Sequence, residues 1–270
     1  CAPSPIPEPE LTGMLAGEAV KLVKCETNDL EVPADAEIII EGEICPDYKV
    51  EEGPFGEYTG YRTSPRDFRV TFRVNCITYR NNATMTISNM GVPQDEGQLL
   101  RSFSLGLELE KLLKSQGIPV TGVYMHPRST HHMMIVGVKP TYAGIAMQIA
   151  QLAFGSKLGP WFHMVMVVDD QTDIYNWDEV YHAFCTRCNP ERGIHVFKNT
   201  TGTALYPHAN PHDRKWSIGS QVLFDCLWPV DWDKINDVPS LVSFRNVYPK
   251  DVQDKVLSNW TNYGFAPVAR

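Results

Sequence analysis

The sequence predicts a mixed α/β protein in which a strand-rich N-terminal part precedes an α/β layer. Three observations indicate this fold class. Short runs with strand-like alternation dominate residues 1–90. After residue 95, helical and apolar strand patterns alternate, which is typical of layered α/β domains. With 270 residues, 43% of them hydrophobic, the chain can bury one large core or two modest ones.

The N-terminal part contains three strand-like segments. "KLVKCETNDLEVP" and "AEIIIEGEI" are short runs bounded by turn residues, and "FRVTFRVNCITYR" alternates between an apolar and a polar face. Asn81 and Asn82 are typical of a hairpin turn, so we expect "ATMTISNM" to return as a further strand. Such strands fit a barrel or a twisted antiparallel sheet.

The first helix of the α/β layer is predicted from a capping box. Asp95 is followed three residues later by Gln98, and the apolar positions after it predict a helix that ends at Gly117. Two strands, "PVTGVYMHP" and "HHMMIVGVK", follow. A second helix is expected to open on Pro140 and to run to about Phe154.

Local patterns predict one more strand and two more helices in the rest of the layer. "HMVMVVDD" is apolar throughout, as in a strand covered on both faces. "NWDEVYHAFCTRC" predicts a helix capped by Asn176, with Glu179 at the box position. A last amphipathic helix, "PKDVQDKVLSNWTNYG", is expected to end at Gly264.

Composition excludes several classes of protein. The 32 acidic residues outnumber the 24 basic ones, which disfavours nucleic acid as a partner. No apolar run approaches the ~20 residues of a membrane span, so we expect a soluble protein without a membrane partner. The seven cysteines are odd in number and scattered, which indicates reduced thiols and a cytoplasmic location.

The most unusual stretch is "VEEGPFGEYTG" at residues 50–60. Glu52 and Glu57 flank a Gly-Pro-Phe-Gly turn, in which we expect Phe55 to be a packing anchor. The pattern fits a solvated acidic turn. It also fits two carboxyl groups whose pKa values differ, a glycosidase-like pair, or a pair that shares an arginine.

Histidine and cysteine positions suggest a further site. His182, Cys185 and Cys188 have ligand-like spacing, which fits either zinc or packed thiols. His131 and His132 are adjacent in a predicted strand, so they are expected to point to opposite faces.

Charged residues near strand and helix ends allow two interpretations each. Asp169 and Asp170 end an apolar strand, where they can be functional carboxylates or caps of the following loop. Lys157 in "FGSKLGPWFH" can hold a phosphate or lie on the surface. The sequence has no Gly-rich nucleotide-binding motif of the usual kinds.

Several segments together resemble the UbiD-type decarboxylases, which use prenylated FMN. They are "LAGEAVKLVKCETNDLEVPADAEIIIEGEI", "EGPFGEYTGY", "ITYRNNA", "VVDD", "FCTRC" and "VLSNWTNYGF", in family order over nearly the whole chain. The resemblance is to the branch that acts on aromatic acids such as ferulate or hydroxybenzoate. It implies that residues 1–98 are the C-terminal part of a split β-barrel flavin-binding domain, and that residues 99–270 are an α/β dimerisation domain.

The same resemblance implies roles for four residues. Glu52 would orient an arginine through an ion pair, and Glu57 would protonate the carbon left after CO₂ departs from a prenylated-FMN adduct. Glu8 would bind Mn²⁺ or Mg²⁺ beside the flavin phosphate, with K⁺ as a further ion. Lys157 would assist cofactor binding.

The resemblance also implies a substrate pocket. Its wall would consist of Tyr58, Glu96, Gly97, Arg101, Pro160, Trp161, His163, Thr203 and Leu205. Because unpaired buried polar groups are costly, the polar members favour a hydroxylated benzoate, such as protocatechuate or gallate, over cinnamate.

Members of this family are longer, and the arginine, asparagine and histidine of their site come from an N-terminal part. We therefore expect three partners: the N-terminal portion of the same enzyme, a small aromatic carboxylic acid, and a further copy in a dimer or higher homo-oligomer. The chain alone is expected to be inactive. The alternative is a non-catalytic assembly subunit or an inactive fragment.

Overall fold

The computed structural model of the chain describes residues 6–63 and 65–266. They form two compact units. The first extends to Pro140 and resumes over Gly144–Leu227, and the second comprises Thr141–Ala143 and the residues from Trp228 onward. Among the described residues, no helix is long and apolar enough to cross a membrane. Cys1, one of the cysteines expected to be reduced, lies outside them.

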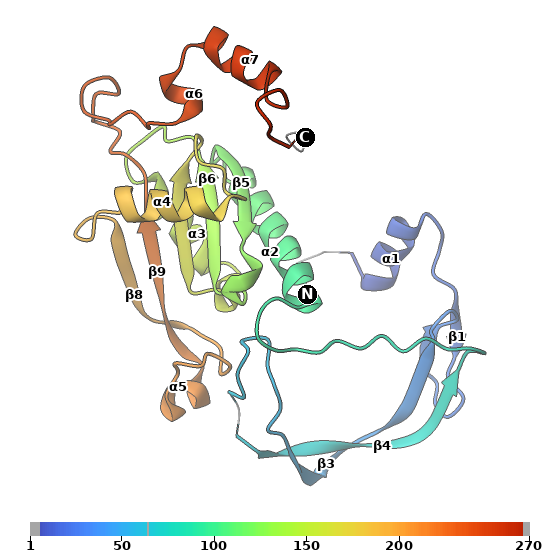
Figure 1. Cartoon of the computed structure of the whole chain (residues 1–270). Coiled ribbons are helices and arrows are strands. Elements are labelled where there is room, and N and C mark those ends of the chain that lie inside the picture. Colours follow the sequence, from blue (N-terminus) through green and yellow to red (C-terminus); the bar gives the residue numbers. More distant parts are fainter. Residues whose placement is uncertain (1–5, 64, 267–270) are drawn as a thin grey trace. The chain divides into compact units, whose positions relative to one another are not determined.

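Figure 1 labels most of the helices and strands of the chain. The order is α1 Glu8–Ala16, β1 Leu22–Lys24, β2 Glu31–Pro33, β3 Ile38–Glu52, β4 Asp67–Tyr79, α2 Glu96–Ser115, β5 Val120–Met125, η1 Pro127–Ser129, β6 Met133–Val138, α3 Ile145–Gly155, η2 Gly159–Trp161, β7 Met164–Asp169, α4 Trp177–Arg187, β8 Ile194–Thr201, α5 Pro211–Trp216, β9 Ile218–Asp225, α6 Phe244–Val247 and α7 Lys250–Ser258.

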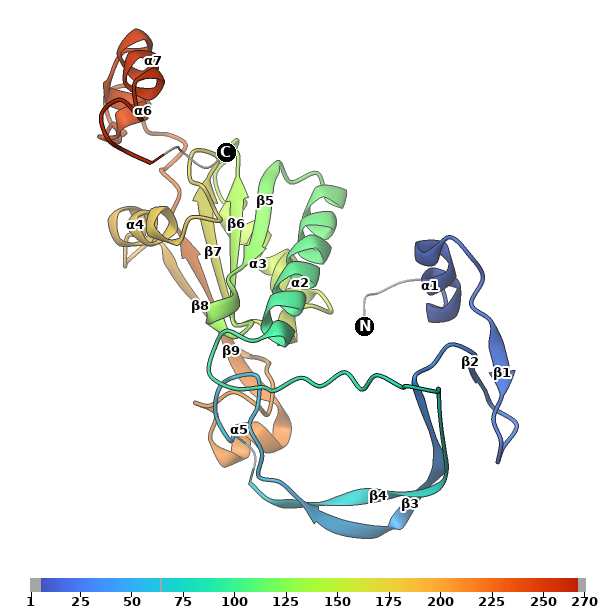
Figure 2. The same cartoon turned by 45° about the vertical axis from the view of Figure 1, so that its right-hand side comes forward.

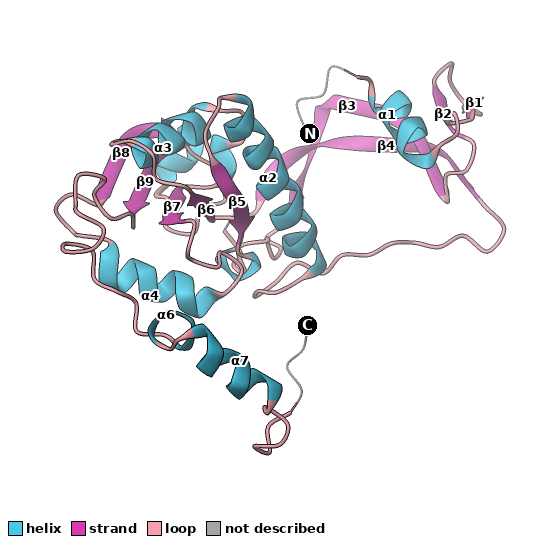
Figure 3. Ribbon diagram, turned by 90° about the horizontal axis from the view of Figure 1, so that it is seen from above, coloured by secondary structure: helices cyan, strands magenta, loops and turns pink. Residues whose placement is uncertain are grey.

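A five-stranded mixed sheet forms the centre of the first unit. Its strand order is β5-β6-β7-β9-β8, with β6, β7 and β9 parallel and both edge strands antiparallel to their neighbours. Figure 3 shows α2 and α3 on one face of the sheet and α4 on the other. The predicted mixed α/β fold is confirmed, and the apolar strand β7 lies between two parallel neighbours as its sequence indicates.

The start of α2 is built as the sequence predicts. The Asp95 carboxylate accepts a 2.8 Å hydrogen bond from the Gln98 N–H, and the Gln98 side chain accepts one of 3.1 Å from the Asp95 N–H. This capping box satisfies two amides at the helix start. The helix ends at Ser115, and Gly117 follows with φ 76°, in the left-handed region that favours glycine.

The predicted start of α3 is wrong. The helix begins at Ile145 rather than at Pro140, because Gly144 occupies the N-cap position with φ 80° and interrupts a helical path from the proline. Its end at Gly155 lies close to the predicted Phe154. The apolar side of α3 then packs into the main core with α2 and the sheet.

The N-terminal strands form two separate antiparallel pairs, β1–β2 and β3–β4. Figure 2 shows β3 and β4 as a long bent ribbon, with irregular register at Glu41/Gly42 and at Cys45/Lys49. The strand predicted for residues 83–90 is absent from the structure. Asn82 does have the positive φ of a turn, 61°, but β4 pairs with β3 and the chain continues as a loop.

Sequence reasoning missed α1 and the region from β8 to β9. Strand β9 lies in the interior of the sheet, between β7 and β8, and Leu223 on it is fully buried. Its apolar segment "VLF" followed by "CLW" is the signal that was overlooked. In the second unit, α7 ends at Ser258 rather than at Gly264, which follows a series of turns.

Candidate active site

The turn that carries Glu57 is closed by its own backbone. The Glu57 N–H donates to the Tyr61 carbonyl over 3.0 Å, and the Gly60 N–H donates to the Glu57 carbonyl over 2.9 Å. Gly60 has φ 80°, which a glycine tolerates without strain. Glu57 is half-buried, and the next side chain, Tyr58, is buried.

Two polar side chains fix this turn to the α/β layer. The Gln98 Nε2 amide donates a 2.8 Å hydrogen bond to the Tyr58 carbonyl oxygen. The Arg214 guanidinium of α5 donates to the carbonyl of Thr63, and also to that of Tyr206 over 3.1 Å. These bonds satisfy buried carbonyls, so they hold the turn and the β8–α5 loop in one place.

Tyr58 lies in a cluster of aromatic rings. Its ring stacks on His131 at 5.3 Å between centroids and meets the edge of His132 at 5.9 Å. His132 in turn lies 4.8 Å from His163, and Tyr206 contacts both of these imidazoles. The predicted opposite orientation of His131 and His132 is therefore wrong. Both residues precede β6 in a turn, where His131 has φ 66°, so strand alternation does not apply.

Burial makes these imidazoles weak bases. It lowers the pKa of His132 to about 3, with a smaller contribution from the neighbouring His163. It also lowers the pKa of His131 to about 4, helped by the charge of Arg101, and that of His163 to about 4. All three rings are therefore neutral at pH 7. Burial likewise raises the pKa of Tyr58 to about 12, so the phenol stays protonated.

Several polar atoms of the cluster have no hydrogen-bond partner among the described residues. They are Tyr58 Oη, His131 Nδ1, His132 Nε2 and His163 Nδ1. Buried polar atoms are normally paired, so unpaired ones grouped in one place indicate contact with water or a ligand.

Arg101 and Trp161 complete the wall beside Tyr58. The Arg101 guanidinium lies 4.8 Å from the Trp161 ring centroid and 5.7 Å from that of Tyr58. Trp161 is held by the short helix η2. There the Gly159 carbonyl accepts a 3.0 Å hydrogen bond from Gln221, and a Cβ at Gly159 would collide with the Phe154 carbonyl.

Most of the predicted pocket residues lie at or beside this cluster. Tyr58, Arg101, Trp161 and His163 belong to it directly, and the Pro160 carbonyl accepts a 3.2 Å hydrogen bond from the Tyr206 hydroxyl. Thr203 and Leu205 lie in the loop whose carbonyls Arg214 binds. Gly97 lies in the first turn of α2, next to Gln98, whose carbonyl oxygen lies 3.3 Å from His131 Nε2.

Glu96 does not form an ion pair with Arg101 among the described residues. Its exposed carboxylate accepts a 3.2 Å hydrogen bond from the Asn89 N–H, and hydrogen bonds from its own N–H and from Ser88 lower its pKa. Glu96 is thus bound to the loop before α2.

Glu52 and Glu57 differ in their surroundings. Glu52 is exposed at the end of β3, with its carboxylate 3.9 Å from Arg69 Nε. Among the described residues, no hydrogen bond joins the two glutamates and no arginine forms an ion pair with both. Phe55 is 53% exposed, so its predicted role as a packing anchor is wrong. Backbone hydrogen bonds and glycines shape the turn instead.

The described residues do not form a complete metal site. In the described part of the chain, no group of three or more histidine, cysteine, aspartate or glutamate side chains is placed to hold a metal ion. Glu8, exposed at the start of α1, provides a single carboxylate, so a metal site does not fit these residues alone. Lys157 is exposed and forms no ion pair with any described residue, so its ammonium group is accessible to a phosphate.

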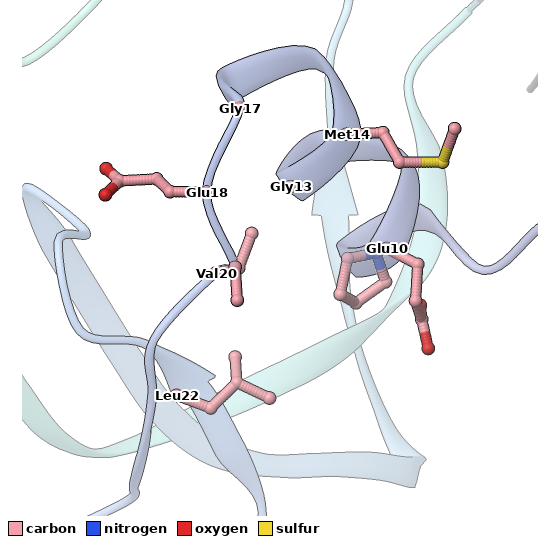
Figure 4. Close-up of a pocket in the computed structure, with 9 residues that line it drawn as sticks. Glu10, Gly13, Met14, Gly17, Glu18, Val20 and Leu22 are labelled. Carbon is pink, nitrogen blue, oxygen red and sulfur yellow. The ribbon is translucent and has the colours of Figure 1, made fainter.

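A separate hollow lies between α1 and the segment that leads into β1. It has a volume of about 610 Å³ and is lined by residues that include Glu10, Met14, Glu18 and Leu22 (Figure 4). None of the predicted site residues lines it. A smaller hollow of about 270 Å³ is lined by residues that include Tyr206 and His208, whose rings stack with centroids 5.3 Å apart.

Asp169 is part of the sheet-to-helix packing. Its carboxylate accepts a 2.7 Å hydrogen bond from the Arg187 guanidinium and one of 2.8 Å from the Thr172 hydroxyl. This pair, with both side chains about 10% exposed, closes the loop between β7 and α4. Of the two thiols on that helix and its end, Cys185 is exposed and Cys188 packs against the core on the α4 side.

Sequence reasoning missed several residues of the site. They are Gln98 as an anchor of the turn, Tyr206, His208 and Arg214, while His131 and His132 were noted but not assigned to the pocket. The adjacent histidines and the "YPHANPHDR" segment, rich in histidine and turn residues, were the available signals.

Comparisons with known proteins identify the family of the chain. The family model described as the 3-octaprenyl-4-hydroxybenzoate carboxy-lyase Rift-related domain matches residues 1–93, and the C-terminal domain of the same carboxy-lyase matches residues 98–226. Ferulic acid decarboxylase 1 of Saccharomyces cerevisiae is 30% identical over 273 residues, which cover 97% of this chain and 54% of that protein.

Solved structures give the same result. Vanillic acid decarboxylase of Sedimentibacter hydroxybenzoicus in its closed form superposes with a TM-score of 0.78 at 27% identity, over 96% of this chain and 53% of that one. The UbiD-class enzyme HmfF from Pelotomaculum thermopropionicum, in complex with FMN, superposes with a TM-score of 0.74 at 28% identity, over 89% and 52%. The chain spans about half the length of the relatives it matches. Its sequence and fold confirm the resemblance, and the chain belongs to the UbiD family of carboxy-lyases.

Proposed function

We propose that this chain forms part of an enzyme that reversibly decarboxylates an aromatic carboxylic acid, with prenylated FMN as cofactor and Glu57 as proton donor. One observation carries the proposal. The 2.8 Å hydrogen bond from Gln98 to the Tyr58 carbonyl fixes the turn of Glu57 beside the wall of rings that includes Tyr58, Arg101 and Trp161. The Glu57 carboxyl acts electrostatically on the Tyr58 phenol, which supports its position near these rings.

Glu57 suits the proton transfer that such a reaction needs. The bond between the ring carbon and the carboxylate breaks, CO₂ leaves, and a proton from Glu57 forms the new C–H bond. A bound prenylated flavin would supply a sink for the electron pair left behind. Since Glu57 is half-buried, its side chain reaches water and can be protonated again after each turnover.

Glu52 would act on an arginine supplied by the N-terminal portion of the enzyme. Its exposed carboxylate has one weak ion pair among the described residues, 3.9 Å from Arg69 Nε, and is therefore accessible to such a partner. Glu8 would contribute one oxygen to a Mn²⁺ or Mg²⁺ ion, and Lys157 would bind a phosphate of the flavin. We keep the division into a flavin-binding part, 1–98, and a dimerisation part, 99–270, as part of this proposal.

The ring cluster favours a hydroxylated benzoic acid as substrate. The unpaired Tyr58 hydroxyl and the unpaired nitrogens of the neutral imidazoles of His131, His132 and His163 match hydroxyl groups, which both donate and accept hydrogen bonds. A substrate without hydroxyls would leave these buried atoms unpaired, at a cost of about 1–3 kcal/mol each.

The alternative is a non-catalytic assembly subunit or an inactive fragment. Intact-mass determination and a UV-visible spectrum of the purified protein separate the two. A second polypeptide with flavin-like absorption, and release of CO₂ from 4-hydroxybenzoate, protocatechuate or gallate by that assembly, would support the enzyme. The same assembly with bound flavin but without CO₂ release or ring-proton exchange in D₂O would support the alternative.

A further inference from the structure

Arg101 carries a positive charge that no carboxylate of the described residues neutralises. Its guanidinium lies 4.8 Å from the Trp161 ring centroid and 5.7 Å from that of Tyr58, and no acid of the described chain lies within ion-pair distance. Two other arginines of the same unit show the usual pairing with a carboxylate. The Arg73 guanidinium lies 2.5 Å from Glu43, and that of Arg80 lies 3.1 Å from Glu37.

The groups around Arg101 do not supply a counter-charge. The nearby imidazoles of His131, His132 and His163 are buried and neutral. Two acids act electrostatically on the cluster: Glu57 on Tyr58 and Asp95 on His131. Asp95 is occupied by the cap of α2, and Glu57 forms no ion pair with Arg101.

The aromatic contacts of Arg101 bear on which ligand its guanidinium can bind. The rings of Trp161 and Tyr58 lie beside the guanidinium, and an aromatic ring offers its N–H groups no strong hydrogen-bond acceptor. Among the described residues, these N–H groups donate no hydrogen bond. A planar fork of this kind matches a carboxylate, which accepts two parallel hydrogen bonds. Arg101, which is half-buried, can therefore bind an anion that the described residues do not provide.

We infer that Arg101 binds a second carboxylate on the aromatic substrate, one that stays on the ring when CO₂ leaves. This rests on the proposed function and narrows its substrate class to aromatic acids with two carboxylates. The proposed hydroxyl groups of the substrate are compatible with a second carboxylate, because one aromatic ring can carry both kinds of substituent. Arg101 then determines the specificity for the substrate, while Glu57 donates the proton to the reacting carbon.

Binding measurements test this without relying on turnover. The purified protein, assembled with the N-terminal portion, is titrated calorimetrically with benzoate, isophthalate and terephthalate. We expect one of the two diacids to bind roughly 10- to 100-fold more tightly than benzoate, as a charge-assisted bidentate contact implies. Arg101→Gln should remove this preference. Arg101→Lys should restore it only in part, because an ammonium group lacks the planar fork. Arg128→Gln, at an exposed arginine, is the control and should keep the preference.

Three results would overturn the inference. They are equal binding of benzoate and both diacids, a preference that survives in Arg101→Gln, and an equal loss of benzoate and diacid affinity, which would mean that Arg101 binds the reacting carboxylate. CO₂ release from 4-hydroxybenzoate, measured in parallel, reports on the proposed function separately. Release without a diacid preference leaves the function standing and rejects the role of Arg101. An Arg101-dependent diacid preference without CO₂ release from any of these acids supports the anion site and rejects the decarboxylase.

Discussion

The Gln98 side-chain amide donates a 2.8 Å hydrogen bond to the carbonyl oxygen of Tyr58, 40 residues earlier in the chain. The same side chain accepts a hydrogen bond from the Asp95 N–H in the capping box of α2. One fully buried glutamine therefore starts a helix and fixes the turn that carries Glu57.

Gln98→Glu separates these two roles. A glutamate keeps the capping box but cannot donate to the Tyr58 carbonyl. We expect the free energy of unfolding to fall by about 1–3 kcal/mol, since a buried acceptor loses its partner, and the amides of residues 57–61 to exchange faster. Urea denaturation and hydrogen exchange measure the two effects. Lys111→Gln, on the exposed side of the helix, is the control, and a Gln98→Glu protein as stable as this control would contradict the assigned role.

Asp169 and Asp170 form a natural matched pair for a second test. Asp169→Ala leaves the Arg187 charge without its buried carboxylate, which typically costs about 3–5 kcal/mol. Asp170 is exposed, so Asp170→Ala should change the stability by no more than about 0.5 kcal/mol. Thermal and urea unfolding of both variants give the comparison. Similar losses for the two would show that the Asp169–Arg187 ion pair does not stabilise the β7–α4 loop.

The buried imidazoles predict a dependence of stability on pH. The pKa of His132 is about 3 in the folded protein and about 6.5 in an unfolded chain, so the unfolded chain binds more protons between these values. His131 and His163 act in the same direction. Stability is therefore full above about pH 6.5 and is lost as the pH falls toward 4, by on the order of 1–3 kcal/mol for each ring.

Variants separate the contribution of the imidazoles to the pH dependence of stability from that of the carboxylates, which also titrate in acid. His132→Gln should reduce the fall in unfolding free energy between pH 6.5 and pH 4, measured by urea denaturation at each pH. His212→Gln is the control because the side chain of His212 is 70% exposed. Identical pH profiles for the wild type and His132→Gln would refute the assignment.

Glu57→Gln tests the proton donor of the proposed reaction. An amide cannot supply the proton, so the rate of CO₂ release by the assembled enzyme should fall by about 10²- to 10⁴-fold, with little change in stability. Glu43→Gln, which alters an exposed ion pair on the β3–β4 ribbon, is the matched control and should keep the activity. Full activity of Glu57→Gln would assign proton transfer to another group.

The sequence by itself determined the elements whose signals are local. The capping box of Asp95 and Gln98 predicted the start of α2, and the apolar run of β7 predicted a strand covered on both faces. Both predictions succeeded because hydrogen bonds between near neighbours and the periodicity of burial are encoded within a few residues. Family segments along the chain likewise identified the carboxy-lyase family.

Only the tertiary structure decided which distant residues meet. His131 and His132 were expected on opposite faces, but a turn with positive φ brings both rings to Tyr58, more than 70 residues earlier. Arg214 donates hydrogen bonds to the carbonyl of Thr63, which lies 151 residues earlier in the chain, and to that of Tyr206, 8 residues earlier. It thereby connects the segment that follows Glu57 with the β8–α5 loop. Such contacts depend on the packing of separate elements, and no local pattern of residues specifies them. The surroundings of Arg101 became visible for the same reason: only the fold shows that no carboxylate of residues 6–63 and 65–266 lies within ion-pair distance of its guanidinium.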